Sequence, residues 1–487
     1  MNHHTSGVSE IGHIKSYYFG VATIAGLPRV FVHEMLTFDD GTPAGVVVGY
    51  DEDNVFALMF GKVDRAQPIF RSNQLYSIPI SDKLVGRVIG VQGQPLDGKT
   101  AVTANRIPVF AQAPGIIDRD PVTRPLITGI KIIDTMLPIG RGQRELIIGD
   151  RKIGKTTIAM DTVIHQGVES SPIKCIYVVC GKTAQEAEEV VRILEEHDAL
   201  YYTTIVAATA NDSLAAQYLA PFVGTAIGEF YRQQGWDALV VYDDLFRHAQ
   251  TYRDISLLLN RAPGRESYPN DVFSLHAGLL ERAGQMSVKN GGGSLTALPI
   301  METQEGDISA FVPTNLISIT DGQIYLDRGL FQKRFLPAIN VGLSVSRIGG
   351  QAQPPILKLV TGGLRLALAQ ERELQKLTQL ETEISKDAVG KIKRGELILE
   401  LIKQEKHKTL TWQEQVVLFR AVEEGYFDDL EKDQWAKLED LLLQLMRTKY
   451  KELILKIEGE KLTESISKDI EDTIAQFKRE FVKNDDE

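Results

Sequence analysis

The chain has 487 residues, enough for about three domains of ordinary size, so a small module held together by disulfides or a metal ion is excluded. Its 54 Lys and Arg against 65 Asp and Glu give a formal net charge of −11, so the overall basic surface typical of nucleic-acid-binding proteins is missing. No stretch reaches the roughly 20 apolar residues that a membrane-spanning helix needs, and we expect neither secretion nor membrane insertion.

The first expected domain, residues 1–80, is a small β-barrel. From about residue 17 the sequence consists of short apolar runs separated by turn residues such as Asp39-Asp40-Gly41. The runs are Val30-Phe31-Val32, Val46-Val47-Val48 and Val55-Phe56-Ala57-Leu58-Met59-Phe60. Short strands bounded by turn signals are typical of all-β barrels and sandwiches.

The second expected domain, residues 81–354, alternates strands with amphipathic helices. The strands Leu146-Ile147-Ile148 and 176–179 are each followed by an apolar stripe at helical spacing, and a capping box of Thr183 with Glu186 begins the second helix. The stripes consist of Met160, Val163 and Ile164, and of Ala187, Val190, Val191 and Leu194. This alternation predicts a parallel sheet.

The third expected domain, residues 355–487, is a helical bundle. After Pro354-Pro355 the chain becomes charge-dense, and Thr411 with Glu414 forms another capping box. One predicted helical stripe contains Leu357, Val360, Leu364 and Leu368, and the last contains Ile466, Ile470, Ile474, Phe477 and Phe481. Such stripes are typical of bundle cores.

Residues 149–156 match the pattern G-x-x-x-x-G-K-[ST], directly after an expected strand and at the start of an expected helix. The glycines let backbone N–H groups curl around phosphate oxygens, Lys155 neutralises the β- and γ-phosphates, and Thr156 offers its hydroxyl to Mg²⁺. We therefore predict that ATP or ADP binds here with Mg²⁺. The predicted binding residues are Gly149, Asp150, Arg151, Lys152, Ile153, Gly154, Lys155, Thr156 and Thr157.

A P-loop site also needs a carboxylate at the end of a neighbouring buried strand, where it holds the water shell of the metal. Asp243, at the end of the apolar run 238–242, is the predicted residue, and Asp244 either takes its place or caps the turn. The triplet Gly181-Lys182-Thr183 repeats part of the pattern, but position 176, where the first glycine would stand, is isoleucine. We interpret this triplet as a strand end followed by a helix cap.

Several long segments match one family specifically. They cover residues 113–117, 128–131, 137–145, 263–269 and 344–347. With them the chain resembles the alpha subunits of F-type ATP synthases over nearly its whole length. The resemblance implies an N-terminal β-barrel, a central α/β P-loop (RecA-like) domain and a C-terminal α-helical bundle, which correspond to the three expected domains.

The resemblance also separates this chain from the catalytic beta subunits, which are similar to alpha. A beta subunit carries Glu after the glycine that ends the strand following the P-loop helix, and that carboxylate orients the attacking water. The matching residue here is Lys182, where alpha subunits usually carry Gln. A lysine, with a reference pKa of about 10.4, is cationic at neutral pH and cannot do this task. We expect the nearby Glu186, Glu188 and Glu189 to form a solvated helix face.

Two further roles are implied by the resemblance. Arg347 matches the arginine that alpha extends into the active site of the neighbouring beta subunit, a catalytic role suited to a permanently charged guanidinium. Pro337 and Gln404 match part of the adenine-side pocket, where Leu336 and Lys406 replace the Arg and the second Gln of the family.

The implied function is that of a non-catalytic, nucleotide-binding subunit of a rotary ATP synthase, in which ATP synthesis or hydrolysis is coupled to proton or sodium transport. The implied partners are beta subunits in an alternating hexamer, the gamma central stalk and the peripheral stalk of the membrane sector. Contact with the membrane would occur only through the assembled complex, on the cytoplasmic side of the cell inner membrane. Barrel-like sequence begins by about Tyr17, where the family has a helical extension that docks delta, and this departure implies the alternate bacterial type that lacks delta.

Two other functions remain as alternatives. A self-sufficient P-loop ATPase, like a beta subunit or a secretion-system ATPase, would need a carboxylate in place of Lys182. A nucleic-acid translocase would need basic and aromatic residues in the barrel. The barrel region instead contains Asp39, Asp40, Asp51, Glu52 and Asp53, so we expect no nucleic-acid partner.

Overall fold

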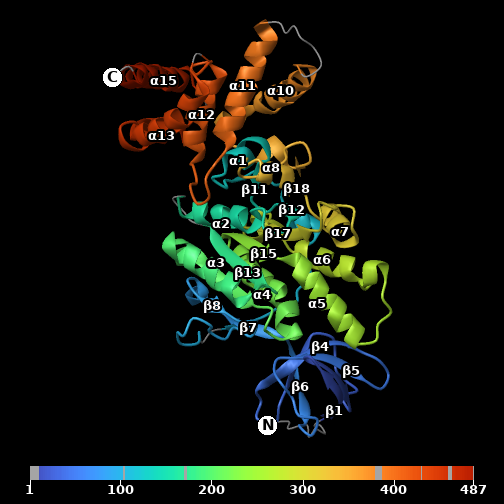
Figure 1. The fold of residues 1–487 in the computed structure, drawn as a ribbon. Helices are drawn as coiled ribbons and strands as arrows, with labels where there is room; N and C mark the ends of the chain where they lie inside the picture. Colours follow the sequence, from blue (N-terminus) through green and yellow to red (C-terminus); the bar gives the residue numbers. More distant parts are fainter. Residues whose placement is uncertain are drawn as a thin grey trace. The chain divides into compact units, whose positions relative to one another are not determined.

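The computed structural model describes residues 10–102, 105–168, 173–378, 386–428, 430–458 and 463–485 (Figure 1). The chain divides into two compact units, each assembled from several segments. The first unit comprises Met1–Pro121, Gly142–Arg151 and Ser171–Asp321, and the second Val122–Arg141, Lys152–Ser170 and Gly322–Glu487.

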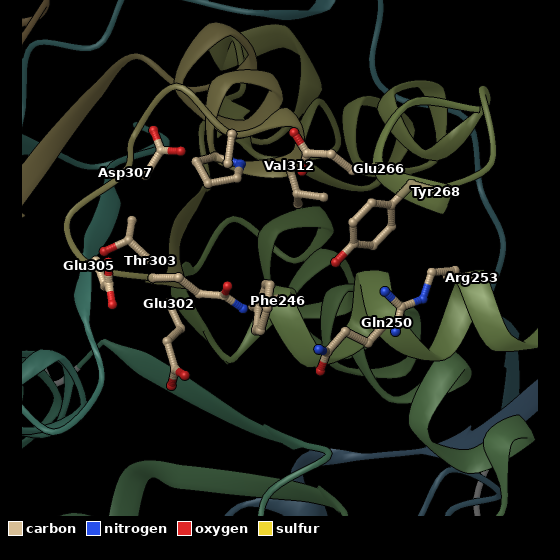
Figure 2. Close-up of a pocket in the computed structure, with 13 residues that line it drawn as sticks. Phe246, Gln250, Arg253, Glu266, Tyr268, Glu302, Thr303, Glu305, Asp307 and Val312 are labelled. Atoms are coloured by element: carbon tan, nitrogen blue, oxygen red, sulfur yellow. The ribbon is translucent and has the colours of Figure 1, made fainter. Parts of the chain in front are cut away.

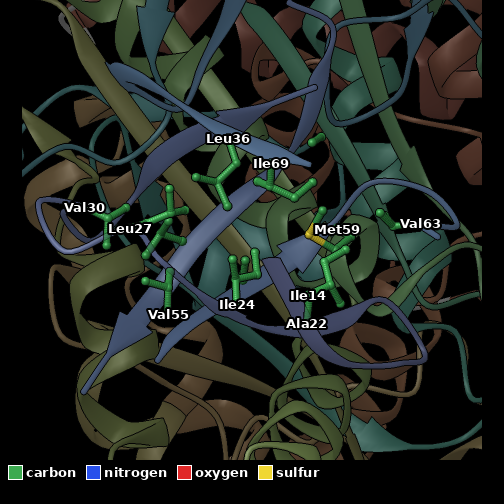
Figure 3. Packing of buried hydrophobic residues seen from close by; sticks show 13 residues of the cluster. Ile14, Ala22, Ile24, Leu27, Val30, Leu36, Val55, Met59, Val63 and Ile69 are labelled. Carbon is green, nitrogen blue, oxygen red and sulfur yellow. The ribbon is translucent and has the colours of Figure 1, made fainter. Parts of the chain in front are cut away.

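The first unit begins with a closed barrel of six antiparallel strands in the order β1-β2-β5-β4-β3-β6. The strands are β1 (Ile11–Tyr18), β2 (Val21–Ala25), β3 (Glu34–Thr37), β4 (Pro43–Tyr50), β5 (Val55–Met59) and β6 (Ile69–Leu75). Side chains such as Ile24, Leu36 and Ile69 fill the interior and have no exposed surface (Figure 3). The predicted barrel is therefore confirmed.

The strand predicted at Val30-Phe31-Val32 is wrong, whereas the other two apolar runs lie in β4 and β5. The chain turns at this point, because the Val30 N–H donates to the Leu27 carbonyl at 3.3 Å and His33 has a φ of +67°. Val30 nevertheless contributes to the barrel core. The apolar run reflects burial and not strand geometry.

The rest of the first unit is built on a parallel sheet in the order β12-β17-β15-β13-β14-β8 (Figure 1). The strands are β8 (Val88–Ile89), β12 (Leu146–Asp150), β13 (Lys174–Cys180), β14 (Thr203–Ala208), β15 (Asp237–Asp243) and β17 (Ser294–Thr303). β13 and β15 are buried along nearly their whole length, as is usual in parallel sheets covered on both faces. The strand–helix alternation in the sequence thus gave the correct sheet type.

The helices of the first unit are α3 (Ala184–Glu196), α4 (Leu214–Gln233), α5 (Leu245–Leu258), α6 (Val272–Leu280) and α7 (Phe311–Ile319). Helix α4 packs against β13 and β15, and it approaches the sheet so closely that a Cβ at Gly224 would lie 2.2 Å from Val178 Cγ2. The predicted capping box of Thr183 and Glu186 begins α3. Smaller elements are the antiparallel pair β7 (Ser77–Ile80) and β9 (Asn105–Pro108), β16 (Gly284–Gln285), and 3₁₀ turns at Asp82–Leu84, Ile116–Asp118, Ala199–Tyr202, Arg265–Ser267 and Val288–Asn290.

The second unit is mainly helical. Its helices are α1 (Lys131–Met136), α2 (Lys155–His165), α8 (Arg328–Gln332), α9 (Pro355–Thr361), α10 (Leu364–Thr378), α11 (Lys386–Ile402), α12 (Trp412–Glu423), α13 (Lys432–Thr448), α14 (Lys451–Ile457) and α15 (Glu464–Asp485), with 3₁₀ turns at Gln166–Val168 and Gly349–Ala352. Two antiparallel strand pairs accompany them, β10 (Pro125–Leu126) with β11 (Ile139–Gly140) and β18 (Gly322–Leu326) with β19 (Val345–Ser346).

The helical region after residue 354 confirms the predicted bundle with one correction. The stripe of Leu357, Val360, Leu364 and Leu368, expected on a single helix, is divided between α9 and α10. Gly362 and Gly363 separate the two helices. All four side chains of the stripe are nevertheless buried. The capping box of Thr411 and Glu414 begins α12, and Ile470 and Ile474 are buried on α15. None of the helices built from the described residues is long and apolar enough to cross a membrane.

Candidate functional site

The phosphate loop predicted from the sequence connects β12 to α2. Gly154 has a φ of +104°, in the left-handed region that favours glycine, and directly precedes Lys155, the first residue of α2. Arg151 and Lys152 are exposed, Ile153 and Lys155 are buried, and Thr156 and Thr157 are half-buried in the first helical turn. A strand, a glycine-containing turn and a helix N-terminus thus follow one another as a phosphate cradle requires.

Asp150 fixes the end of β12 within the first unit. Its Oδ1 accepts hydrogen bonds from Thr303 Oγ1 at 2.8 Å and from the Gly306 N–H at 2.7 Å. The buried carboxylate therefore links the end of β12 to the end of β17. This is a structural role, whereas the sequence predicted Asp150 only as a residue of the phosphate loop.

Asp243 and Lys182 form an ion pair at the ends of two adjacent strands of the first unit. Asp243 is the last residue of β15, its side chain has no exposed surface, and its Oδ1 lies 2.7 Å from Lys182 Nζ. Its Oδ2 accepts a hydrogen bond from the Tyr177 hydroxyl at 2.8 Å. The structure thus brings together two residues that the sequence singled out separately, and adds Tyr177, which sequence reasoning missed because a tyrosine on a buried strand gives no distinct signal.

The electrostatics of this pair favour the charged lysine. Burial alone would lower the pKa of Lys182, but the carboxylates of Asp243 and Asp244 outweigh that effect and raise the pKa above its usual value. Burial, followed by the charge of Asp243, raises the pKa of Asp244 to about 6. Asp244 caps α5 by accepting from the Arg247 N–H at 2.8 Å, which is the second of the two roles expected for it.

The acidic residues near Lys182 in the sequence have other tasks. Glu186 Oε2 accepts from the Thr183 N–H and the Thr183 hydroxyl, both at 2.9 Å, and so completes the capping box of α3. Glu188 and Glu189 are exposed on the same helix, as expected. The carboxylate closest in sequence to Lys182 is therefore committed to a helix cap.

A cavity of about 760 Å³ lies in the first unit between α5 and the segment that follows β17 (Figure 2). Acidic groups from Glu266, Glu302, Glu305 and Asp307 line it together with Tyr268 and Arg253. Glu266 and Tyr268 belong to the segment 263–269, which carried the family resemblance in the sequence without any role being assigned to it.

In the second unit, Gln404 and Leu336 line another cavity of about 870 Å³. Gln404 Oε1 accepts from the Lys131 N–H at 2.9 Å, and its Nε2 donates to the carbonyls of Gly129 and Lys408, each at 2.7 Å. The Gln404 N–H also donates to the Leu336 carbonyl at 2.8 Å, and Leu336 precedes Pro337. The structure therefore brings Gln404 next to the Leu336-Pro337 pair, as the resemblance implied, but the amide of Gln404 already holds three backbone groups.

Arg347 follows β19 in the second unit, and its side chain is exposed. The preceding Ser346 is anchored, because its hydroxyl donates to the Pro138 carbonyl at 2.8 Å and accepts from the Gly349 N–H at 3.2 Å. Within the described part of the chain Arg347 forms no ion pair. A fixed backbone thus presents an exposed guanidinium.

Two family descriptions match the chain, "ATP synthase alpha/beta family, nucleotide-binding domain" over residues 129–346 and "ATP synthase alpha/beta chain, C terminal domain" over residues 353–477. Proteins named "ATP synthase subunit alpha" are similar along nearly their whole length. The one from Aquifex aeolicus (strain VF5) is 46% identical over 480 residues, which is 98% of this chain and 95% of the relative. Those from Helicobacter acinonychis (strain Sheeba) and Helicobacter pylori (strain G27) are each 45% identical over 478 residues, 97% of this chain and 94% of the relative.

Proposed function

This chain belongs to the ATP synthase alpha/beta family as an alpha subunit of the F-type enzyme, and on that premise we propose that it binds nucleotide without hydrolysing it and supplies Arg347 to a neighbouring beta subunit. It is part of an enzyme complex that synthesises and hydrolyses ATP. We further propose that it alternates with beta subunits in a hexamer, contacts the gamma central stalk and the peripheral stalk, and lies on the cytoplasmic side of the inner membrane. Ion transport, of protons or sodium, would be coupled to catalysis by the assembled complex.

The observation that carries the non-catalytic assignment is the ion pair of Lys182 with Asp243. At the position where a beta subunit holds its water-activating carboxylate, this chain holds an ammonium group that is 2.7 Å from Asp243 Oδ1. Because an ammonium cannot accept a proton from water at neutral pH, it cannot serve as the general base. Glu186 does not replace it, since its carboxylate caps α3.

Nucleotide binding is supported by the local geometry of residues 149–157. The backbone turns at Gly154 into the N-terminus of α2, where N–H groups and the helix dipole favour phosphate oxygens, and the buried Lys155 adds a full positive charge. Pro337 and Gln404 are our proposal for the adenine side of the site. Because the amide of Gln404 already makes three hydrogen bonds, we expect its contribution to be mainly the placement of this segment.

Magnesium is the ordinary companion of a P-loop nucleotide, and the sequence assigns it to Thr156 and Asp243. Thr156, in the first turn of α2, has the hydroxyl that this role needs. Asp243 already contacts Lys182 through Oδ1 and accepts from Tyr177 through Oδ2, so it would offer the water shell of the metal only the remaining acceptor sites of these oxygens. The proposed nucleotide site therefore rests on the P-loop backbone and on Lys155.

The test compares ATP hydrolysis by the purified chain alone with hydrolysis by its complex with the beta subunit. We expect almost no turnover by the chain alone. In the complex, Arg347→Ala should lower turnover by about 10³-fold or more, because an arginine finger stabilises charge in the transition state. Arg192→Ala, which removes an exposed arginine on α3, serves as the control and should leave turnover unchanged.

Appreciable hydrolysis by the lone chain would overturn the non-catalytic assignment. Full activity of the complex with Arg347→Ala would overturn the arginine-finger assignment. Arg347→Lys keeps the charge but not the planar fork, so a low rate for this variant as well would support bidentate recognition of phosphate.

A further inference from the structure

We propose that His407 is a positioning residue, which fixes the segment 404–408 on the phosphate-binding helix α2 and thereby sets how much the nucleoside part of ATP adds to the affinity. The inference rests on the proposed nucleotide-binding function and deepens it. The contacts that carry it all lie within the second unit. This unit contains residues from both sides of the proposed site, namely Lys155, Thr156, Leu336, Pro337 and Gln404.

His407 contacts α2 through a single carboxylate. Its Nδ1 lies 2.8 Å from Asp161 Oδ1, and its backbone N–H donates to the same oxygen at 3.1 Å. Because an ionised carboxylate only accepts hydrogen bonds, Nδ1 carries the proton in this contact. The two side chains are only 15% and 9% exposed, so water has little access to compete for the bond. The segment 404–408 is therefore held on α2 by two bonds to one partner.

Asp161 relates this contact to the phosphate-binding end of the helix. It lies six residues after Lys155 on α2, a separation of about 9 Å along the helix axis. The helix contains neither glycine nor proline from its first residue to its last, so nothing in its sequence favours a bend. A segment that is attached at Asp161 consequently keeps a fixed distance from Lys155.

Gln404 lies in the segment that His407 attaches. Its backbone N–H donates to the Leu336 carbonyl at 2.8 Å, and its side-chain Nε2 donates to the Lys408 carbonyl at 2.7 Å. The second of these bonds closes residues 404–408 into a turn that contains His407. Gln404, Leu336 and His407 also line the cavity of about 870 Å³ in the second unit. Attachment of this turn to α2 therefore holds the proposed base side of the site in register with the phosphate side.

The backbone of His407 gives independent support for a functional reason. Its φ is +62°, in the left-handed region that residues other than glycine seldom adopt. Such a conformation persists only where the surrounding structure enforces it, and it is concentrated at ligand-binding and active sites. Here Asp161 enforces it, because one oxygen accepts from both the backbone and the ring of the same residue.

The test compares the binding of ATP and of inorganic tripolyphosphate by the purified full-length chain in one MgCl₂ buffer, by isothermal titration calorimetry. Tripolyphosphate carries the phosphates without the nucleoside, so it reports on the phosphate side alone. His407→Gly removes the imidazole and permits the left-handed backbone. We expect this variant to bind ATP about tenfold more weakly than the wild type, equivalent to about 1.4 kcal/mol, and to bind tripolyphosphate within about threefold of the wild type.

Two further variants separate positioning from a general effect on the fold. His407→Asn should bind ATP within about threefold of the wild type, because asparagine tolerates a positive φ and its Nδ2 can donate to Asp161. Asn260→Gly is the matched control. It replaces another left-handed residue, with a φ of +53°, at an exposed position in the first unit, and it should bind both ligands like the wild type.

Equal weakening of ATP and tripolyphosphate binding in His407→Gly would overturn this inference, and so would ATP binding at the wild-type level. Failure of the wild type to bind either ligand would instead overturn the proposed nucleotide site. If His407→Gly does not fold, as judged by circular dichroism, Asp161→Ala takes its place, because it removes the acceptor from α2. That variant should also lose ATP affinity preferentially, and an unchanged ratio of the two dissociation constants would contradict the proposal.

Discussion

Arg282 and Glu229 form a buried ion pair in the first unit. The Arg282 Nε donates to Glu229 Oε1 at 3.1 Å, a second nitrogen of the guanidinium donates to the Val109 carbonyl at 3.0 Å, and the two side chains are only 2% and 8% exposed. Glu229 lies on α4, the helix that packs on the parallel sheet, so the pair links this helix to the segment before β16.

We expect Arg282→Met to destabilise the protein by about 3 kcal/mol, since the buried Glu229 would keep only its longer contact with Arg232, at 3.4 Å. Urea denaturation followed by circular dichroism measures the loss. Arg192→Met is the control, because Arg192 and Glu196 form an exposed pair on α3 for which such a change costs about 0.5 kcal/mol or less. Equal effects of the two substitutions would contradict the expectation.

Two buried histidines predict loss of stability in mild acid. His248 Nδ1 lies 3.1 Å from His276 Nε2, and burial lowers the pKa of His248 to about 4. Burial, followed by the charge of His248, lowers the pKa of His276 well below its usual value. The unfolded chain therefore binds protons near pH 6.5 that the folded chain does not accept until about pH 4, so stability falls as the pH decreases through this range.

Between pH 7 and pH 4 the urea midpoint of the wild type should therefore decrease more, or rise less, than that of His276→Gln, because the raised pKa of Asp244 acts in the opposite direction but is common to both proteins. His197→Gln, at an exposed position after α3, should leave the slope as in the wild type. A slope that is the same in all three proteins would show that the buried pair does not cause it.

Gln404 gives a prediction about the second unit. Gln404→Glu keeps the oxygen that accepts from the Lys131 N–H, but places a second oxygen against the carbonyls of Gly129 and Lys408, where the amide donated. We expect a loss of about 1 to 3 kcal/mol, because two hydrogen bonds are lost and a carboxylate oxygen faces two carbonyl oxygens, although the Gly129 carbonyl keeps its bond from the Leu410 N–H at 3.0 Å. Thermal unfolding measures this loss of stability. Lys406→Gln, at an exposed position two residues away, is the control and should change the stability by no more than about 0.5 kcal/mol.

The phosphate loop requires glycine at position 154. A Cβ there would have room, since its nearest neighbour is Leu326 Cδ2 at 3.9 Å, but the φ of +104° is rarely adopted by other residues. We therefore expect Gly154→Ala to weaken ATP binding by about tenfold, equivalent to a backbone strain of about 1 to 3 kcal/mol. Gly278→Ala, at an open and exposed position in α6, should leave ATP binding unchanged and stabilise that helix by up to about 1 kcal/mol.

The sequence predicted the local features of this protein well, because their causes are local. Both capping boxes begin the helices expected of them, and Asp243 ends the strand that its apolar run predicted. The errors have local causes as well. A buried turn at Val30 has the apolar character of a strand, and Gly362-Gly363 divides a stripe whose spacing continues across the break.

The pairings between distant residues could not be predicted from single positions. Lys182 was recognised as a departure from the catalytic pattern, but its contact with Asp243 arises from the parallel pairing of β13 with β15. The same holds for Gln404, because two of its three partners, Lys131 and Gly129, lie more than 270 positions away and are set by how the second unit assembles.

The interleaving of the two units has a consequence for how the chain matures. Gln404 bonds to Gly129 across 275 positions, and the second unit collects segments from both sides of the intervening first-unit sequence. During synthesis on the ribosome, Gly129 is made 275 residues before Gln404, so the bond between them forms only after most of the chain has been made. An excised C-terminal fragment starting at residue 322 would lack α1, α2 and these bonding partners, so neither unit can be cut out as one continuous piece of chain.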